Sequence, residues 1–129
     1  MPVTYTIAMK KPGLSPDAAP KYYPVLTDRR ITNLRKLCYM ISDRSTLTSA
    51  DVMGVIHAMI ELIPDLLQDG RTVRLDGFGT FNLHASSEGQ TNPDKITSRD
   101  ITGVRMSFLP DKDIKRRLNK TKFVKKDKS

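Results

Sequence analysis

Residues 73–81, Val-Arg-Leu-Asp-Gly-Phe-Gly-Thr-Phe, decide the fold of this chain. Gly77 and Gly79 flank an aromatic residue, and glycine adopts backbone angles that other residues avoid. Phe78 and Phe81 supply large apolar rings that can anchor a sharp bend against a core. The pattern predicts a structural hinge made of these four residues, with a strand on each side of it.

A long amphipathic helix is predicted directly before this motif. Thr48 is a good N-cap, and Asp51 stands where its carboxylate can complete a capping box. Apolar residues then recur over an arc of roughly 160° at helical spacing, and Gly70 is well placed to end the helix. An arc this wide predicts packing against the chain's own fold and against a second subunit. The residues predicted for the subunit interface are Val52, Val55, Ile56, Met59, Ile63 and Leu66.

The rest of the pattern predicts an α+β chain. Apolar residues recur at helical spacing between residues 27 and 41, before the long helix. After that helix, alternating apolar residues predict strands, and the polar residues 86–98 offer few side chains to a core. The expected elements are a first helix from Thr27 onward, capped by Thr27, Asp28 or Thr32, strands at residues 72–75, 80–85 and 103–108, a polar and flexible arm at 86–98, and a short helix opened by Pro110.

Both ends of the chain fall outside this arrangement. Alternating apolar residues over 3–9, and a short run at 22–26, predict two extra strands joined by a proline-rich loop at 11–20. Residues 120–129 are predicted to be disordered. The expected domains are a strand-loop-strand extension at 1–26, a main domain at 27–118 and a basic tail at 119–129.

The net charge of +8 lies mostly at one end of the chain. Residues 112–129 contain nine Lys or Arg and two Asp, a charge of +7, which leaves +1 for the preceding residues. Such a segment attracts polyanions with an affinity that falls as salt rises. Charge alone leaves open the alternative of a solvated tail that aids solubility.

The order helix, helix, strand, Gly-Phe-Gly-Thr-Phe, strand, arm, strand, short helix resembles the HU and integration host factor family of bacterial histone-like DNA-binding proteins. The resemblance covers about Thr32 to Leu118. It implies an HU-like fold with a helical hairpin base, a three-stranded antiparallel sheet with an arm, and a short C-terminal helix. The N-terminal strands resemble those of extended HU-related variants. In this family two subunits interlock, and each sends an arm around the minor groove.

The resemblance also implies which residues contact DNA. Asn92 and Pro93 match the arm tip of the family, where a proline wedges between base pairs; an ordinary Asn-Pro turn is the alternative. Lys112 and Lys115 match lysines that contact phosphates without reading sequence. The residues predicted to contact DNA are Asn92, Pro93, Lys95, Arg99, Arg105, Lys112, Lys115, Arg116, Arg117 and Lys120.

Enzymatic functions have little support in the sequence. The Gly-Phe-Gly motif lacks the third glycine of a dinucleotide fingerprint and the Gly-Lys-Ser/Thr of a phosphate loop. His57 and His84 are the only histidines and are expected to face solvent, while Cys38 is expected in the core. We therefore expect no catalytic residue, no cofactor and no metal site.

The predicted function is that of a homodimeric histone-like protein, cytoplasmic and nucleoid-associated, that binds duplex DNA mainly without sequence specificity and bends or compacts it. No membrane or small-molecule partner is expected. The alternative is an HU-like structural or protein-interaction dimer with weak or no DNA binding, which the zero net charge of residues 86–99 favours. RNA binding by the tail is a third hypothesis, but the sequence shows no aromatic platform on which single-stranded bases could stack.

Overall fold

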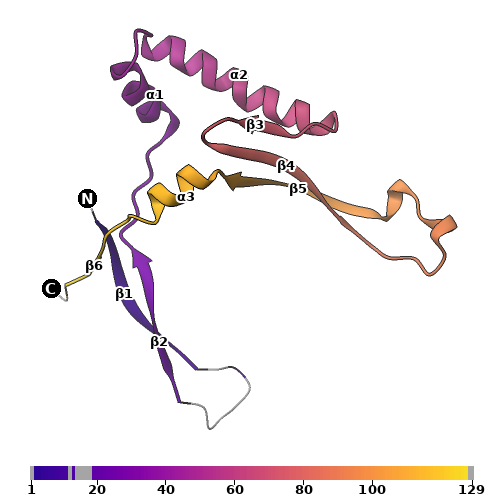
Figure 1. Ribbon diagram of the computed structural model, residues 1–129, viewed down its shortest axis with the longest axis horizontal. Helices are drawn as coiled ribbons and strands as arrows, with labels where there is room; N and C mark the ends of the chain where they lie inside the picture. Colours follow the sequence, from indigo (N-terminus) through magenta and orange to yellow (C-terminus); the bar gives the residue numbers. More distant parts are fainter. Residues whose placement is uncertain (1, 12, 14–18, 128–129) are drawn as a thin grey trace. The chain divides into compact units, whose positions relative to one another are not determined.

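The computed structural model describes residues 2–11, 13 and 19–127 (Figure 1). The chain divides into two compact units, a central unit of residues 33–116 and a terminal unit of residues 1–32 and 117–129. The two ends of the chain thus belong to one unit, whereas the predicted domains treated them separately. Most of the proline-rich loop predicted at residues 11–20 lies outside the described residues.

In the central unit, α1 (Leu34–Asp43) begins after Asn33, whose side chain accepts a hydrogen bond of 2.9 Å from the Lys36 N–H. The cap is therefore not one of the three residues considered from the sequence, because asparagine caps a helix as well as threonine or aspartate does. Cys38 is 1% exposed, which confirms its predicted place in the core.

The ends of α2 (Ser49–Gln68) are as predicted. Asp51 N–H donates to Thr48 Oγ1 at 3.2 Å, and Thr48 N–H donates back to the Asp51 carboxylate at 3.3 Å, which closes the capping box. At the other end Gly70 has a φ of 79° and donates its N–H to the Leu67 carbonyl at 3.1 Å. The Arg71 N–H donates to the Leu66 carbonyl at 3.0 Å. Together these two bonds form the Schellman motif, which glycine at this position permits.

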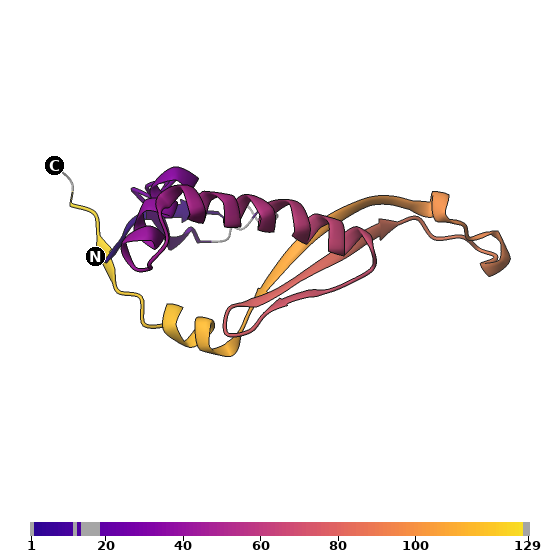
Figure 2. The same cartoon turned by 90° about the horizontal axis from the view of Figure 1, so that it is seen from above.

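The central sheet has the strand order β3-β4-β5 and is antiparallel. Its strands are β3 (Val73–Leu75), β4 (Gly79–Ser87) and β5 (Ile101–Pro110). The β4–β5 ladder is the longer one, and the two strands extend together away from α2 into the arm (Figure 2). α3 (Lys112–Leu118) follows, so Pro110 ends β5 and does not open the helix as predicted. The arrangement is the predicted α+β, HU-like one.

The Gly-Phe-Gly motif forms a tight turn between β3 and β4. Phe78 N–H donates to the Leu75 carbonyl at 2.9 Å, and Gly77 has a φ of 84°, a value that suits the third position of a type II turn. The rings of Phe78 and Phe81 each lie 4.9 Å from the ring of Phe108 on β5. Three aromatic side chains thus hold the turn against the end of β5.

Gly79 is the position in this turn where no side chain fits. A Cβ built there would lie 2.5 Å from the carbonyl oxygen of Leu109 and would overlap the ring of Phe108. The obstacle includes backbone, which cannot rotate away as a side chain can. The pairing of β4 with β5 therefore requires glycine at this position.

The terminal unit contains a second sheet, with the strand order β2-β1-β6. β1 (Val3–Lys10) and β2 (Lys21–Thr27) pair antiparallel and confirm the predicted N-terminal strands. β6 (Phe123–Lys125) pairs parallel with β1, so the structure differs there from the disorder expected over residues 120–129, of which 128 and 129 lie outside the described residues. The physical reason is that β1 offers backbone groups to a further strand, and these accept and donate bonds of 2.8 Å on either side of β6.

We predict that Gly79→Ala destabilises the protein by about 1–3 kcal/mol, because the added methyl group must displace the backbone of β5. Gly103→Ala is the matched control, since a Cβ at Gly103 on the same strand pair meets no atom within 4 Å. Urea denaturation at one protein concentration measures both free energies of unfolding. Equal effects of the two substitutions would contradict the close contact at Gly79.

Candidate nucleic-acid interface

Asp111 attaches α3 to the Gly-Phe-Gly turn. Its backbone N–H donates to the Phe78 carbonyl at 2.9 Å, and its carboxylate accepts the Gly77 N–H at 3.1 Å. Its carbonyl accepts the Lys115 N–H at 3.0 Å, within the first turn of α3. The guanidinium of Arg74 lies 3.7 Å from the same carboxylate, which is 19% exposed. The position of α3 therefore depends on the turn.

The sequence analysis did not identify this role of Asp111. Its place before a basic helix indicated only a favourable helix dipole. The residues that it binds are distant in sequence, since Gly77 and Asp111 are 34 positions apart. Sequence spacing offered no signal for the contact.

α3 presents a cluster of exposed basic side chains. Lys112, Lys115, Arg116 and Arg117 are all exposed. Arg116 forms an ion pair of 3.2 Å with Asp113, and no ion pair among the described residues involves either lysine. The two lysines are thus available to an external anion, and a helix surface of this kind can hold phosphates through charge.

The arm tip is folded around hydrogen bonds, which gives a defined structure to the polar stretch predicted as a flexible arm. Asn92 accepts the Asp94 N–H at 3.0 Å, and Pro93 stands exposed at the start of the short helical turn η1 (Pro93–Lys95). A second turn, η2 (Ser98–Asp100), follows before β5. Asn92 is therefore a side chain that shapes the turn presenting the proline.

Asp100 closes the base of the arm tip. Its carboxylate accepts the Thr97 N–H at 2.9 Å and the Gln90 side-chain amide at 2.8 Å. Both hydrogen bonds stabilise the charged carboxylate and hold the pKa of Asp100 below its usual value. The bond from the Thr97 N–H has the larger effect, and the bond from Gln90 the smaller. A lowered carboxylate pKa means that this local stabilisation is present above the ordinary pKa and is lost as the pH falls through the lowered value.

The other predicted DNA residues are spread over three segments. Lys95 and Arg99 are exposed on η1 and η2 of the arm, and Arg105 is exposed on β5, paired across the ladder with His84. Lys120 is exposed just beyond α3. His84 and His57 both face solvent, as predicted, and the His84 ring lies 2.6 Å from the hydroxyl oxygen of Ser107.

The predicted subunit interface on α2 is only partly exposed in one chain. Val52 and Ile63 are 3% and 9% exposed, so they already pack within the central unit. Ile56 and Leu66 are half-buried. The exposed apolar residues of α2 are Val55, Met59, Ile60 and Leu62, of which the last two were not in the predicted interface. Ile60 and Leu62 belong to the wide apolar arc of this helix, so the sequence contained the pattern from which they could have been added to the interface.

Few side chains of the described residues are buried. The buried apolar ones are Cys38, Val52, Ile63 and Leu67, whereas large apolar side chains are exposed along α1, α2 and β5. A soluble monomer rarely leaves so many large apolar side chains in water. The central unit has the surface of a chain whose core is completed by another chain.

Comparison with known proteins places the chain among HU-related proteins. Over residues 1–125 it matches the HU-HIG family, described as an HU domain fused to wHTH, Ig, or glycine-rich motif. The match covers nearly the whole chain, so the chain belongs to this family. The resemblance to HU and integration host factor drawn from the Gly-Phe-Gly motif is thereby confirmed.

Curated relatives match part of the chain. Integration host factor subunit alpha of Caulobacter vibrioides is 30% identical over 77 residues, which are 55% of this chain and 77% of the relative. Integration host factor subunit beta of Shewanella baltica is 33% identical over 79 residues, which are 59% of this chain and 82% of the relative.

Two solved structures share the fold. Anabaena HU in a cocrystal with DNA superposes with a TM-score of 0.56 at 19% identity, over 69% of this chain and 99% of that chain. A putative bacterial DNA binding protein from Bacteroides vulgatus superposes with a TM-score of 0.64 at 10% identity, over 95% of this chain and 47% of that chain. At these identities the likeness concerns the fold alone.

We predict that Asp111→Ala lowers the free energy of unfolding by about 1–3 kcal/mol, because it leaves the Gly77 N–H without its acceptor. Asp113→Ala is the matched control on the same helix. Its ion pair with Arg116 is exposed and contributes about 0–1 kcal/mol. Urea denaturation compares the two variants, and equal losses would show that Asp111 does not attach α3 to the turn.

Proposed function

We propose that this protein is a histone-like DNA-binding protein that binds duplex DNA mainly without sequence specificity, and bends or compacts it as a homodimer. The observation that carries the proposal is the arm. The β4–β5 ribbon ends in a hydrogen-bonded tip on which Pro93 is exposed. A rigid apolar ring at the end of a two-stranded arm suits insertion between base pairs from the minor groove.

The energetic logic of such an arm is the exchange of base stacking for protein contact. A wedge between two base pairs costs a few kcal/mol of unstacking, and the bent duplex then touches more of the protein. Asn92 shapes the turn behind Pro93. Lys95 and Arg99 lie on the same arm and would contact the phosphates beside it. None of these groups requires a particular base pair, which supports binding without strong sequence preference.

The exposed basic cluster on α3 supplies the second contact of the proposal. Lys112 and Lys115 would hold phosphates of the same duplex, with Arg116, Arg117 and Lys120 adding positive charge nearby. Arg105 on β5 would face the duplex along the arm. The names of the relatives support this role, since one solved neighbour is an HU–DNA cocrystal and another is a putative DNA binding protein.

A homodimer is the proposed assembly. The exposed apolar residues of α2, together with the small core of one chain, support burial against a second copy. The interface proposed is the α2 surface, with Val55 and Met59 as its exposed members, and Ile56 and Leu66 at its margin. The curated relatives are named as alpha and beta subunits, so a related but different partner chain is the competing assembly.

The proposed role is non-enzymatic and needs no cofactor, and the proposed place of action is the nucleoid in the cytoplasm. Among the described residues, no helix is both long and apolar enough to cross a membrane. The domain division at residues 26 and 118 also stays a proposal, with the DNA contacts in the middle domain.

A second candidate function is a structural or protein-interaction dimer with weak DNA binding. The observation that favours it is charge. Residues 33–116, which form the central unit, contain 11 Lys or Arg and 11 Asp or Glu, so their net charge is zero. A neutral body attracts a duplex less than a basic one does, because fewer counterions are released.

We predict that the double variant Lys112→Ala/Lys115→Ala binds a duplex of about 30 base pairs more weakly at low salt and lowers the slope of log K against log salt by about two for each protomer that contacts the duplex. Fluorescence anisotropy over a salt series measures both quantities. Lys36→Ala on α1, also exposed, is the control and should leave the slope unchanged. Absence of duplex binding by the unmodified protein at low salt would favour the interaction dimer instead.

We also predict that Pro93→Ala reduces the bend of the duplex while changing the salt slope by less than about one, since no phosphate contact is lost. Energy transfer between dyes at the two duplex ends reports the bend. Thr91→Ala, another exposed residue of the arm, is the matched control. A bend that is the same with all three proteins would show that Pro93 is an ordinary turn residue.

A further inference from the structure

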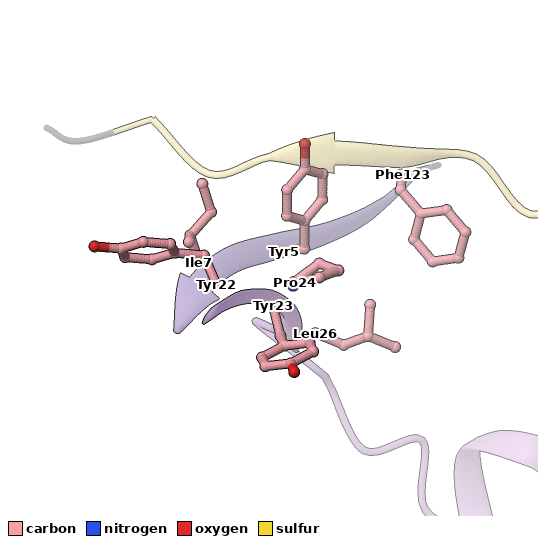
Figure 3. A pocket seen from close by; sticks show the side chains of 7 residues that line it. All are labelled: Tyr5, Ile7, Tyr22, Tyr23, Pro24, Leu26 and Phe123. Atoms are coloured by element: carbon pink, nitrogen blue, oxygen red, sulfur yellow. The ribbon is translucent and has the colours of Figure 1, made fainter. Parts of the chain in front are cut away.

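The terminal sheet carries an aromatic groove that the proposed duplex contacts do not use. The groove has a volume of about 620 Å³ and is formed by side chains from β1, β2 and β6 (Figure 3). Across the β1–β2 ladder, Tyr5 pairs with Leu26 and Ile7 pairs with Pro24, so these four lie on one face. The lining residues are Tyr5, Ile7, Tyr22, Tyr23, Pro24, Leu26 and Phe123.

The rings of this groove are open to solvent. Tyr22 is 66% exposed and Phe123 is 56% exposed. Tyr23 is 43% exposed, and the ammonium group of Lys10 lies 6.0 Å from the centre of its ring. Accessible aromatic rings of this kind are a surface on which planar groups such as nucleic-acid bases can stack.

The sequence analysis found no aromatic platform, whereas the structure gathers several aromatic side chains around one groove. Phe123 lies about a hundred positions after the tyrosines in the chain, and the pairing of β6 with β1 brings it to the same groove. The sequence could not predict that Phe123 joins the tyrosines, because β6 lies within residues 120–129, which were predicted to be disordered from their composition.

Charge separates the terminal unit from the central one. Residues 1–32 and 117–129 contain 11 Lys or Arg and three Asp, a net charge of +8, which is the whole net charge of the protein. Lys125 and Lys126 line a second depression, which shares Ile7 and Tyr22 with the groove, and Lys126 forms an ion pair of 3.1 Å with Asp28. Lys10 and Lys21 pair at the far end of the β1–β2 ladder, on the face of the sheet opposite to Tyr5, Ile7, Pro24 and Leu26.

We propose that the terminal sheet binds single-stranded DNA, with bases stacked on Tyr22 and Phe123 and phosphates held by Lys125, which pairs with Tyr5 across the β1–β6 ladder. Open aromatic rings beside a positive surface are the combination that single-stranded nucleic acid requires. A duplex would leave the rings without partners, since its base faces are covered by stacking. An apolar partner would leave the charge of +8 uncompensated.

The choice of DNA over RNA rests on the proposed function, in which this protein acts on DNA. The single-strand site is nevertheless separate from the duplex contacts. It uses side chains of the terminal sheet, whereas the arm and α3 lysines carry the duplex proposal. The two ideas can therefore fail independently.

The test is fluorescence anisotropy of the full-length protein with a labelled thymidine oligonucleotide of about 20 nucleotides, longer than the usual site of one such module. The double variant Tyr22→Leu/Phe123→Leu keeps apolar area and removes both rings. We expect it to bind the oligonucleotide on the order of tenfold more weakly, or more, and the duplex within about twofold of the unmodified protein. The single variant Tyr22→Phe keeps the ring, and we expect it to bind the oligonucleotide as tightly as the unmodified protein does.

Tyr39→Leu is the matched control, because Tyr39 is 49% exposed but lies on α1 in the central unit. Its oligonucleotide affinity should equal that of the unmodified protein. Circular dichroism of each variant reports whether the strands are kept. A Leu variant that has lost them is replaced by Tyr22→Leu alone, for which the same weakening is expected.

Four outcomes would overturn the proposal. The first is that the oligonucleotide does not bind the unmodified protein at low salt, and the second is that a Leu variant that keeps its strands binds it equally well. Tighter binding of the matching RNA would show that the site is not a DNA site. A lower oligomeric state of Tyr22→Asp in sedimentation, with unchanged oligonucleotide binding, would show that the groove joins copies of this chain. Loss of duplex binding alone would count against the proposed function and leave this inference standing.

Discussion

The close approach of β4 to β5 at Gly79 is the constraint on which the central unit depends. With no Cβ at this position, Phe108 can lie between Phe78 and Phe81, and the β4 strand can begin directly at the turn. The same turn holds Asp111, which holds the first residues of α3. The arm and the basic helix are therefore both extensions of one packed turn. A side chain at Gly79 would disturb the geometry of both proposed DNA contacts.

The HU-like fold and the net charge of the protein belong to different units of the chain. The central unit has the arm, the sheet and the helical base of an HU-like protein, yet its net charge is zero. The terminal unit carries the full net charge and also contains the small sheet with the aromatic groove. Since long-range attraction to a polyanion follows net charge, the terminal unit would dominate the encounter with nucleic acid. The arm and α3 would then determine the geometry of the bound duplex.

Local features of the fold were predictable from the sequence, whereas contacts between distant segments were not. Thr48, Asp51 and Gly70 act within a few residues of themselves, so spacing alone predicted both ends of α2. Asn33 was missed because three earlier residues were also able to cap α1. The contact of Asp111 with Gly77 and the pairing of β6 with β1 join segments far apart in the chain, and no periodicity reports such pairs. Pro93 was located by resemblance, and the structure adds the hydrogen bonds around it.

The most direct test of the central claim is nuclear magnetic resonance of the isotope-labelled protein titrated with duplex DNA. The claim is that the arm and α3 form the duplex interface. It predicts that the largest changes in amide chemical shift fall at residues 92–99 and 112–117. Changes confined to residues 2–11, 19–27 and 120–127, with the arm and α3 unaffected, would contradict it.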